Sequence, residues 1–236
     1  MYKVVFSHKK CSIPDGYVKI DNRKSDLDHR VFSELAGMKL LYNTVEEWEK
    51  DMREKKIRDM PADFISMNHY RRYFDKDCHN RIFVPQPLMF NCTLAQHYDA
   101  CHNIIDLQEC AKAVSETFPA MVQSFNNAMN SNLLIPYIIA IMPVNVFKEY
   151  WNFLYTVLMK YCDNINCHTY AEFKERVTKT EGYNKDIKGR NNDIEYQCRI
   201  PSFLAERLAT CYLKELATKI PVFPAAIVLT EKDQKI

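Results

Sequence analysis

The chain has 236 residues, of which 47% are hydrophobic and 12% aromatic, and its formal net charge is +2. This length and hydrophobic content predict one α/β domain with a substantial core, and the balanced charge argues against a nucleic-acid partner, which usually requires a large basic excess. The four glycines permit neither a GxGxxG nor a GxxxxGK[ST] loop, so the common glycine-rich phosphate loops are excluded.

The first half of the chain predicts strands that alternate with helices. Short apolar runs indicate the strands, and apolar residues at helical spacing indicate the helices. Strands are expected at 2–7, 62–68 and 81–85, and helices at 32–52 and 93–118. Polar residues follow the first two strands directly.

The second half continues the alternation. A strand is predicted at 137–143, and a helix begins behind Asn145, which is a favourable N-cap residue. A further helix is expected at 202–220, preceded by Pro201, and an edge strand within 222–230. The apolar stripe of this helix comprises Phe147, Trp151, Leu154 and Leu158. The aromatic residues of the helix are predicted to lie mostly in the core; they are Tyr150, Trp151, Phe153 and Tyr155.

These elements favour an open, mainly parallel sheet flanked by helices in a single domain of residues 1–220. Residues 221–236 are expected to form a C-terminal edge segment and a frayed tail, and the polar stretch 178–197 a mobile loop. Ligands bind such sheets beyond the carboxyl ends of the strands, so "SHKK" at 7–10 and "NHYRRYF" at 68–74 are expected to converge.

The cysteine pattern predicts a cytoplasmic protein with reduced thiols. There are nine cysteines and no CxxC pair, and the start "MYKVVFSHKK" has no secretory h-region. No run reaches the roughly 18 apolar residues that span a bilayer. His97, Cys101 and His102 have helical spacing but lack a second ligand pair, so no zinc site is expected there.

Five blocks in order carry a family resemblance: "VVFSHKK", "FSELAGMKLLYN", "FISMNHYRRYF", "IIAIMPVNVFKEYWNFLYTVL" and "RIPSFLAERLATCYL". Over about residues 1–217 the chain resembles a family of bacterial capsular and exopolysaccharide biosynthesis proteins. That family, long described as a domain of unknown function and grouped with the GT-A glycosyltransferases, has HYRRYF as its hallmark, and some members resemble galactofuranosyltransferases. Two blocks depart from its pattern, "RKSDLDHRVF" at 23–32 and "MKLLYN" at 38–43, so part of the donor or acceptor pocket is expected to differ.

The resemblance implies a GT-A-like glycosyltransferase in surface polysaccharide synthesis. Its donor would be UDP-galactofuranose or the UDP derivative of another hexose, and its acceptor would be a lipid-linked saccharide. Because such a lipid lies in the cytoplasmic leaflet, peripheral contact with the inner face of the cytoplasmic membrane is also implied. No amphipathic basic helix demonstrates that contact.

Glycosyl transfer requires stabilisation of the departing diphosphate, which most GT-A enzymes provide with a metal at a DxD motif. Here the strand ends in His69, Tyr70, Arg71 and Arg72, and arginine forks bind diphosphate oxygens bidentately. We therefore expect these four residues, with His8 and Lys9, to bind the donor without a required cofactor. Mg²⁺ or Mn²⁺ held by Asp75 and Asp77 is the alternative.

A structural interpretation of the same string is an edge strand with an exposed basic pair. Alternation along a strand would send Tyr70 and Arg72 to one face and His69, Arg71 and Tyr73 to the other.

Glu206 is the candidate general base, because it follows the start of the 202–220 helix, whose N-terminus favours the ionised carboxylate. The resemblance implies inversion by direct displacement. A salt bridge of Glu206 with Arg207 is the competing interpretation. Glu34 and Arg199 are possible supporting residues, and Asp99 and Asp106 are lesser base candidates.

Two other functional classes remain open at this point. One is a nucleotide-sugar-binding module without catalysis, which the altered block at 23–32 favours. The other is a Mg²⁺-dependent sugar-phosphate or nucleotidyl transferase that uses Asp75 and Asp77.

Overall fold

The computed structural model describes residues 1–56, 58–74, 80–183 and 193–229. Within these residues the main sheet comprises β1 (Tyr2–Ser7), β2 (Val18–Asp21), β3 (Phe64–His69), β4 (Arg72–Phe74), β5 (Ile82–Pro85), β8 (Ile141–Pro143), β9 (Val222–Ala225) and β10 (Ile227–Leu229). Two further strands, β6 (Leu88–Met89) and β7 (Leu133–Leu134), pair with each other.

The main sheet confirms the predicted open, mainly parallel architecture. The buried strand β1 pairs in parallel with β2 and β3, and β5 pairs in parallel with β9. β8 joins β3 to β5 with antiparallel pairing, and β4 pairs antiparallel with β3 and β10. The carboxyl ends of β1 and β3 therefore lie side by side, as the parallel pairing requires.

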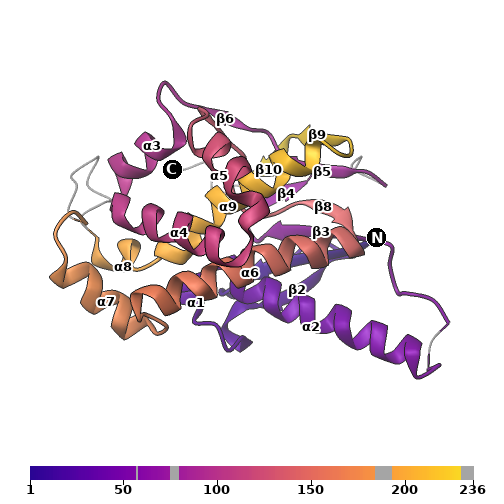
Figure 1. The fold of residues 1–236 in the computed structure, drawn as a ribbon. Helices are drawn as coiled ribbons and strands as arrows, with labels where there is room; N and C mark the ends of the chain where they lie inside the picture. The colour runs from indigo at the N-terminus through magenta and orange to yellow at the C-terminus, as the bar shows by residue number, and fades with distance from the viewer. Residues whose placement is uncertain (57, 75–79, 184–192, 230–236) are drawn as a thin grey trace.

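The sheet is flanked by helices (Figure 1). The helices are α1 (His29–Phe32), α2 (Glu34–Arg53), α3 (Leu94–Cys101), α4 (Ile104–Thr117), α5 (Val122–Met129), α6 (Val144–Ile165), α7 (Tyr170–Lys179), α8 (Ile194–Gln197) and α9 (Ile200–Ala217), with 3₁₀ turns at Asn22–Lys24 and Pro119–Met121. α2 packs against β1 and β2, α6 packs beside α2 against β3 and β8, and α9 packs against α5 and α6.

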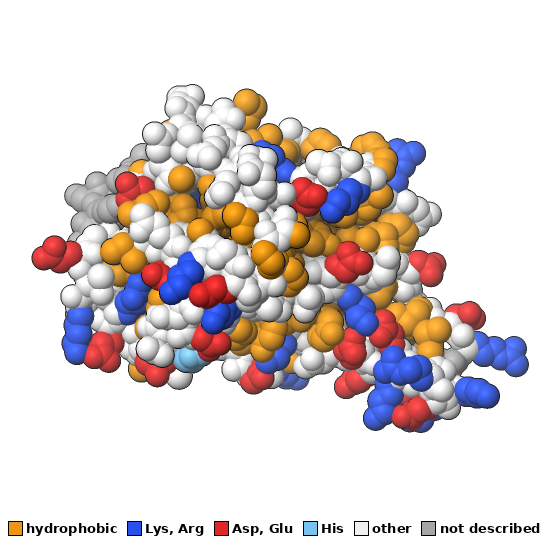
Figure 2. Space-filling view, in the orientation of Figure 1, with side chains coloured by type: hydrophobic (Ala, Val, Ile, Leu, Met, Phe, Trp, Pro, Cys, Tyr) orange, Lys and Arg blue, Asp and Glu red, His pale blue; other side chains and the backbone are white. Residues whose placement is uncertain are grey.

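The core forms where these layers meet. The predicted stripe of α6, from Phe147 through Trp151 to Leu158, is buried, as are Tyr150 and Phe153, which confirms their assignment to the core. The eight cysteines in the described ranges form no disulfide. No helix among the described residues is long and apolar enough to cross a membrane. On the face seen in Figure 2, acidic and basic side chains are interspersed rather than separated by sign.

Several predicted boundaries were wrong for local reasons. The helix expected at 32–52 begins at Glu34, because Ser33 takes a φ of 48° and separates it from α1. The predicted N-cap Asn145 lies inside α6, whose cap position is Pro143; the Val144 N–H bonds instead to the Asp63 carbonyl, 3.0 Å away. Pro201 lies in the first turn of α9 rather than before the helix.

Other segments are divided differently from the prediction. The stretch 93–118 is two helices, because Asn103 caps α4 with its side chain. The single edge strand expected in 222–230 is two strands, β9 and β10. The predicted loop 178–197 contains the end of α7 and the whole of α8, and its residues 184–192 lie outside the described ranges, as does the tail from 230 onward.

Candidate active site

A cavity of about 570 Å³ opens at the carboxyl ends of β1 and β3, between the N-termini of α2 and α9. Its lining is cationic, with five arginines against two glutamates, and it also includes five histidines. These residues are Arg30, Arg71, Arg72, Arg199 and Arg207, His8, His29, His69, His97 and His102, and Glu34 and Glu206. The cavity is therefore suited to an anionic ligand.

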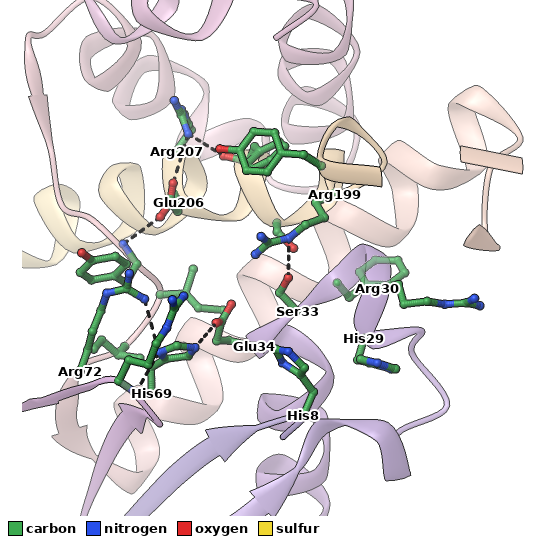
Figure 3. Close-up of a pocket in the computed structure, with 18 of the residues that line it drawn as sticks. His8, His29, Arg30, Ser33, Glu34, His69, Arg72, Arg199, Glu206 and Arg207 are labelled. Carbon is green, nitrogen blue, oxygen red and sulfur yellow. Dashed lines mark hydrogen bonds and ion pairs between the residues drawn. The ribbon is translucent and has the colours of Figure 1, made fainter. Parts of the chain in front are cut away.

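Seven of the eight predicted donor-binding and supporting residues line this one cavity: His8, Glu34, His69, Tyr70, Arg71, Arg72 and Arg199. The predicted base Glu206 lines it as well. Lys9, the eighth, is exposed and does not line it; the Lys9 ammonium lies 5.9 Å from the centre of the Tyr70 ring. The convergence expected from strand order is thus present in the geometry (Figure 3).

The expected alternation of side chains along this string is wrong, because the string is a hairpin. β3 ends at His69, Tyr70 and Arg71 form the turn, and β4 begins at Arg72, which pairs with His69. The reversal of the chain brings both arginines to the cavity, whereas a continuous strand would have sent them to opposite faces. Tyr73 points elsewhere and packs edge-on against Tyr17.

His69 is held in one tautomer by its neighbours. The backbone N–H of Arg71 donates to Nδ1 at 3.3 Å, and Arg72 Nη1 lies 3.3 Å from the same nitrogen. Since Nδ1 must accept, the proton resides on Nε2, which faces Glu34 Oε1 at 3.2 Å. His69 is only 4% exposed, and its two ring nitrogens lie between Arg72 and Glu34.

Two helix N-termini face the cavity and add positive potential. Glu34 is the first residue of α2, and Arg199 occupies the cap position of α9. Arg199 Nε donates to Ser33 Oγ at 3.0 Å, which ties the two helix starts together. Burial raises the pKa of Glu34, but His69, Arg199 and Arg72 outweigh burial, and the pKa of Glu34 lies below its ordinary value.

Glu206 lies in the second turn of α9, and its side chain is 26% exposed. Its Oε1 accepts from the backbone N–H of Tyr137 at 3.0 Å, and its Oε2 accepts from Arg207 Nη1 at 3.3 Å. The predicted salt bridge with Arg207 therefore coexists with the position in the cavity. Burial raises the pKa of Glu206 above its ordinary value, although Arg207 and the Tyr137 amide oppose that shift.

His8 directly follows β1 and lies beside two cavity rings. Its ring centre is 5.9 Å from that of His29 and 5.7 Å from that of Tyr70. Burial and then the nearby Lys9 and His29 lower the pKa of His8, which favours the neutral imidazole.

The remaining candidates lie elsewhere. Asp99 is exposed on α3, and Asp106 is buried in a separate cluster, where it pairs with Arg176 at 2.9 Å. Asp75 and Asp77 lie outside the described residues. His97, Cys101 and His102 all line the cavity, yet among the described residues no group of three or more His, Cys, Asp or Glu side chains is placed to hold a metal ion.

Sequence reasoning missed several cavity residues, chief among them His29, Arg30, Tyr137 and the role of His97 beside Arg207. His29 and Arg30 fall in the block at 23–32, where the pocket was expected to differ, which was the available signal. His97 Nδ1 lies 3.1 Å from Arg207 Nη2. Tyr137 lies in an apolar run and gave no signal.

Comparison with known families adds an independent line of evidence. Residues 55–183, more than half of the chain, match the family described as "Domain of unknown function (DUF4422)". This segment includes the hairpin but ends before α9. The match is consistent with the predicted resemblance at the level of the family.

Among solved structures, the apo structure of the WbbM bifunctional glycosyltransferase is similar, with a TM-score of 0.69 at 14% identity. The alignment covers 98% of this chain and 45% of that chain, so this chain spans less than half the length of WbbM. At this identity the likeness establishes a shared fold. No curated protein matches the chain significantly.

Proposed function

The chain belongs to the DUF4422 family, and we propose that it is a glycosyltransferase that moves a hexose from a UDP-sugar to a lipid-linked saccharide. Galactofuranose is the proposed sugar, and assembly of a capsule or exopolysaccharide is the proposed setting. A lipid-linked acceptor would require peripheral contact with the inner face of the cytoplasmic membrane. The fold shared with WbbM, which is named as a bifunctional glycosyltransferase, supports the class of reaction.

The observation that carries the proposal is the cationic cavity at the strand ends. Arg71 and Arg72 come from the hairpin and Arg199 from the cap of α9. Guanidinium groups and helix N-termini are the groups that proteins use to bind diphosphate oxygens. These groups would neutralise the departing nucleoside diphosphate, and the proposal requires no metal for that step.

The two cavity carboxylates fit different roles, because their pKa values shift in opposite directions. The lowered pKa of Glu34 keeps it an anion, which faces His69 at 3.2 Å and interacts electrostatically with Arg199. The raised pKa of Glu206 gives it a greater proton affinity than an ordinary glutamate. Glu206 is therefore the better general base.

The proposed step is a direct displacement with inversion. The acceptor oxygen attacks the anomeric carbon and forms the new glycosidic bond as the bond to the diphosphate oxygen breaks. The electron pair leaves with the nucleoside diphosphate, and the proton of the acceptor hydroxyl passes to Glu206. The cations around Arg71 and Arg72 stabilise the charge that develops on the leaving group.

The test is binding and hydrolysis of UDP-galactofuranose, UDP-galactopyranose and UDP-glucose, each with and without EDTA. Selective binding of one donor that survives EDTA is expected. Arg71→Met should weaken that binding, whereas Arg53→Met should not, because Arg53 is a 66% exposed arginine at the far end of α2. Binding that EDTA abolishes would move diphosphate recognition to a metal, and binding of no nucleotide sugar would overturn the proposed function.

A further inference from the structure

Tyr137 lies between β7 and β8 and lines the cavity with a strained backbone. Its φ is 63°, in the left-handed region that a bulky side chain rarely adopts. Such a conformation persists only where the surroundings hold it, and it often occurs at functional sites.

The surroundings of Tyr137 hold its segment from both sides. The backbone N–H of Ile135 donates to Thr210 Oγ1 of α9 at 3.1 Å. The Tyr150 hydroxyl of α6 donates to the Ile138 carbonyl, also at 3.1 Å. The two helices therefore fix the chain immediately before and after Tyr137.

Tyr137 also contacts both the proposed diphosphate-binding residue Arg72 and the proposed base Glu206. Its ring lies under the guanidinium of Arg72, whose Cζ is 4.3 Å from the ring centre. Its backbone N–H donates to Glu206 Oε1 at 3.0 Å. Figure 3 shows Arg72 and Glu206 towards the left of the view and His29 and Arg30 on the right.

We propose that Tyr137 is a positioning residue that holds the diphosphate-binding Arg72 and the base Glu206 in one fixed geometry. The ring confines the guanidinium plane, and the amide confines the carboxylate. This inference rests on the proposed function and deepens it, since in-line displacement requires the leaving group and the base to be positioned together. Tyr137 acts through its neighbours and is not itself a catalytic residue.

The ring contact continues into a chain of contacts across the cavity. Arg72 Nη1 lies 3.3 Å from His69 Nδ1, and His69 Nε2 lies 3.2 Å from Glu34 Oε1. Tyr137 is thus the link between a network anchored on α2 and Glu206 on α9. Removing the Tyr137 ring should loosen the Arg72 guanidinium. The backbone N–H that donates to Glu206 is still present after that substitution.

The first experiment measures UDP binding by calorimetry for Tyr137→Phe, Tyr137→Ala and Tyr137→Gly. Phenylalanine keeps the ring and should bind UDP as the wild type does. Alanine and glycine should each lose about tenfold in affinity, the order expected for a partly desolvated arginine–ring contact. Glycine adopts a positive φ without strain, so Tyr137→Gly should melt at or above the temperature of Tyr137→Ala. If UDP affinity falls in step with melting temperature across the three variants, the loss reflects destabilisation of the fold, and the inference is overturned.

The second experiment is a double-mutant cycle between Tyr137→Ala and Arg72→Met, with UDP as the probe. If Tyr137 acts through Arg72, Tyr137→Ala should have little further effect in the Arg72→Met background. An equal loss in both backgrounds would overturn the inference.

The third experiment measures turnover and separates the two proposals. At saturating donor, Tyr137→Ala and Tyr137→Gly should reduce kcat by about tenfold to a hundredfold, because an Arg72 guanidinium that the ring no longer confines is displaced from the leaving group. Tyr137→Phe should restore it. If the wild type turns over a UDP-sugar and Tyr137→Ala equals it in UDP affinity and kcat, the inference alone fails. If the wild type binds no nucleotide sugar, the proposed function and the inference fail together.

Discussion

Replacing Glu206 with glutamine tests the proposed base directly. General-base catalysis contributes about 10²–10⁴ in rate, which is about 3–5 kcal/mol of activation free energy. We expect Glu206→Gln to lose turnover by that factor. Its affinity for UDP should change little, because the glutamine carbonyl can still accept the Tyr137 N–H that Oε1 accepts at 3.0 Å.

The substitution also has a structural cost that the same geometry defines. Both carboxylate oxygens accept a hydrogen bond, from Tyr137 and from Arg207 Nη1 at 3.3 Å. Glutamine has one acceptor oxygen, so its NH₂ must face one of these donors, and the longer bond to Arg207 is the one expected to break. Because Arg207 Nη1 keeps its hydrogen bond to the Phe203 carbonyl at 3.1 Å, the cost should be at the low end of the range for an unmade bond, about 1 kcal/mol.

The assay is the initial rate of UDP release with donor and acceptor, accompanied by calorimetric UDP binding and a melting curve. Glu215→Gln is the matched control, because Glu215 lies on the same helix, is 28% exposed and is outside the cavity lining. That variant should keep turnover within about twofold, as surface substitutions usually do. A folded Glu206→Gln protein that retains more than about a tenth of wild-type turnover would refute the role of Glu206 as the base.

The pH dependence of kcat/KM in the wild type and in Glu206→Gln tests the same assignment. Burial raises the pKa of Glu206, and a base must be deprotonated to act. The acid limb of kcat/KM should therefore lie above the ordinary glutamate value of 4.5, and activity should fall as the pH drops through it. Glu206→Gln should lack this limb. An identical limb in both proteins would assign the titration to another group.

Two further substitutions test the scaffold. Asp106→Asn leaves Arg176 without its buried counter-ion, which lies 2.9 Å away. The free energy of unfolding should fall by about 3 kcal/mol and the melting temperature by about 6–12 °C. A melting temperature within about 2 °C of wild type would contradict this account. Gly37→Ala should lower the free energy of unfolding by about 1–3 kcal/mol, because the new Cβ would lie 2.5 Å from both the Phe6 ring and Asn22 Oδ1. An unchanged urea midpoint would show that these neighbours move aside without cost.

The parts of the fold that could be predicted are those encoded within one segment. β1 and β3 are apolar runs long enough to be buried strands, and α6, from Val144 to Ile165, repeats its apolar residues at helical spacing over about six turns. β2, by contrast, is an edge strand of only four residues whose side chains are half-buried or exposed, so its composition carries little signal.

The candidate site could be predicted where strand ends supply it. His8, His69, Arg71 and Arg72 follow β1 and β3, and parallel pairing brings those ends together without any detail of packing. The direction of each side chain could not be predicted in the same way. Alternation assumes a continuous strand, and it failed because the chain turns at Tyr70.

The block at 23–32, which precedes the segment matched by the family, contributes to one wall of the cavity. His29 and Arg30 come from α1, within "RKSDLDHRVF", and the ring of His29 faces that of His8. The hairpin arginines would contact the diphosphate that all UDP-sugars share. If the donor is a UDP-sugar as proposed, selectivity among donors is expected to depend on this wall.

The middle of the site is the part that sequence patterns miss, and the physical reason is general. Glu34 and Glu206 each lie near the start of a helix, and Arg72 lies in an unusual string, so each has a local signature. Tyr137 lies in "LLIPYIIAIMP", where a tyrosine among aliphatic residues indicates core. Its proposed role comes from a ring contact with Arg72, a backbone N–H and a left-handed φ, and no local pattern in the sequence signals any of the three. Such a residue is recognised only once the fold has brought its partners to it.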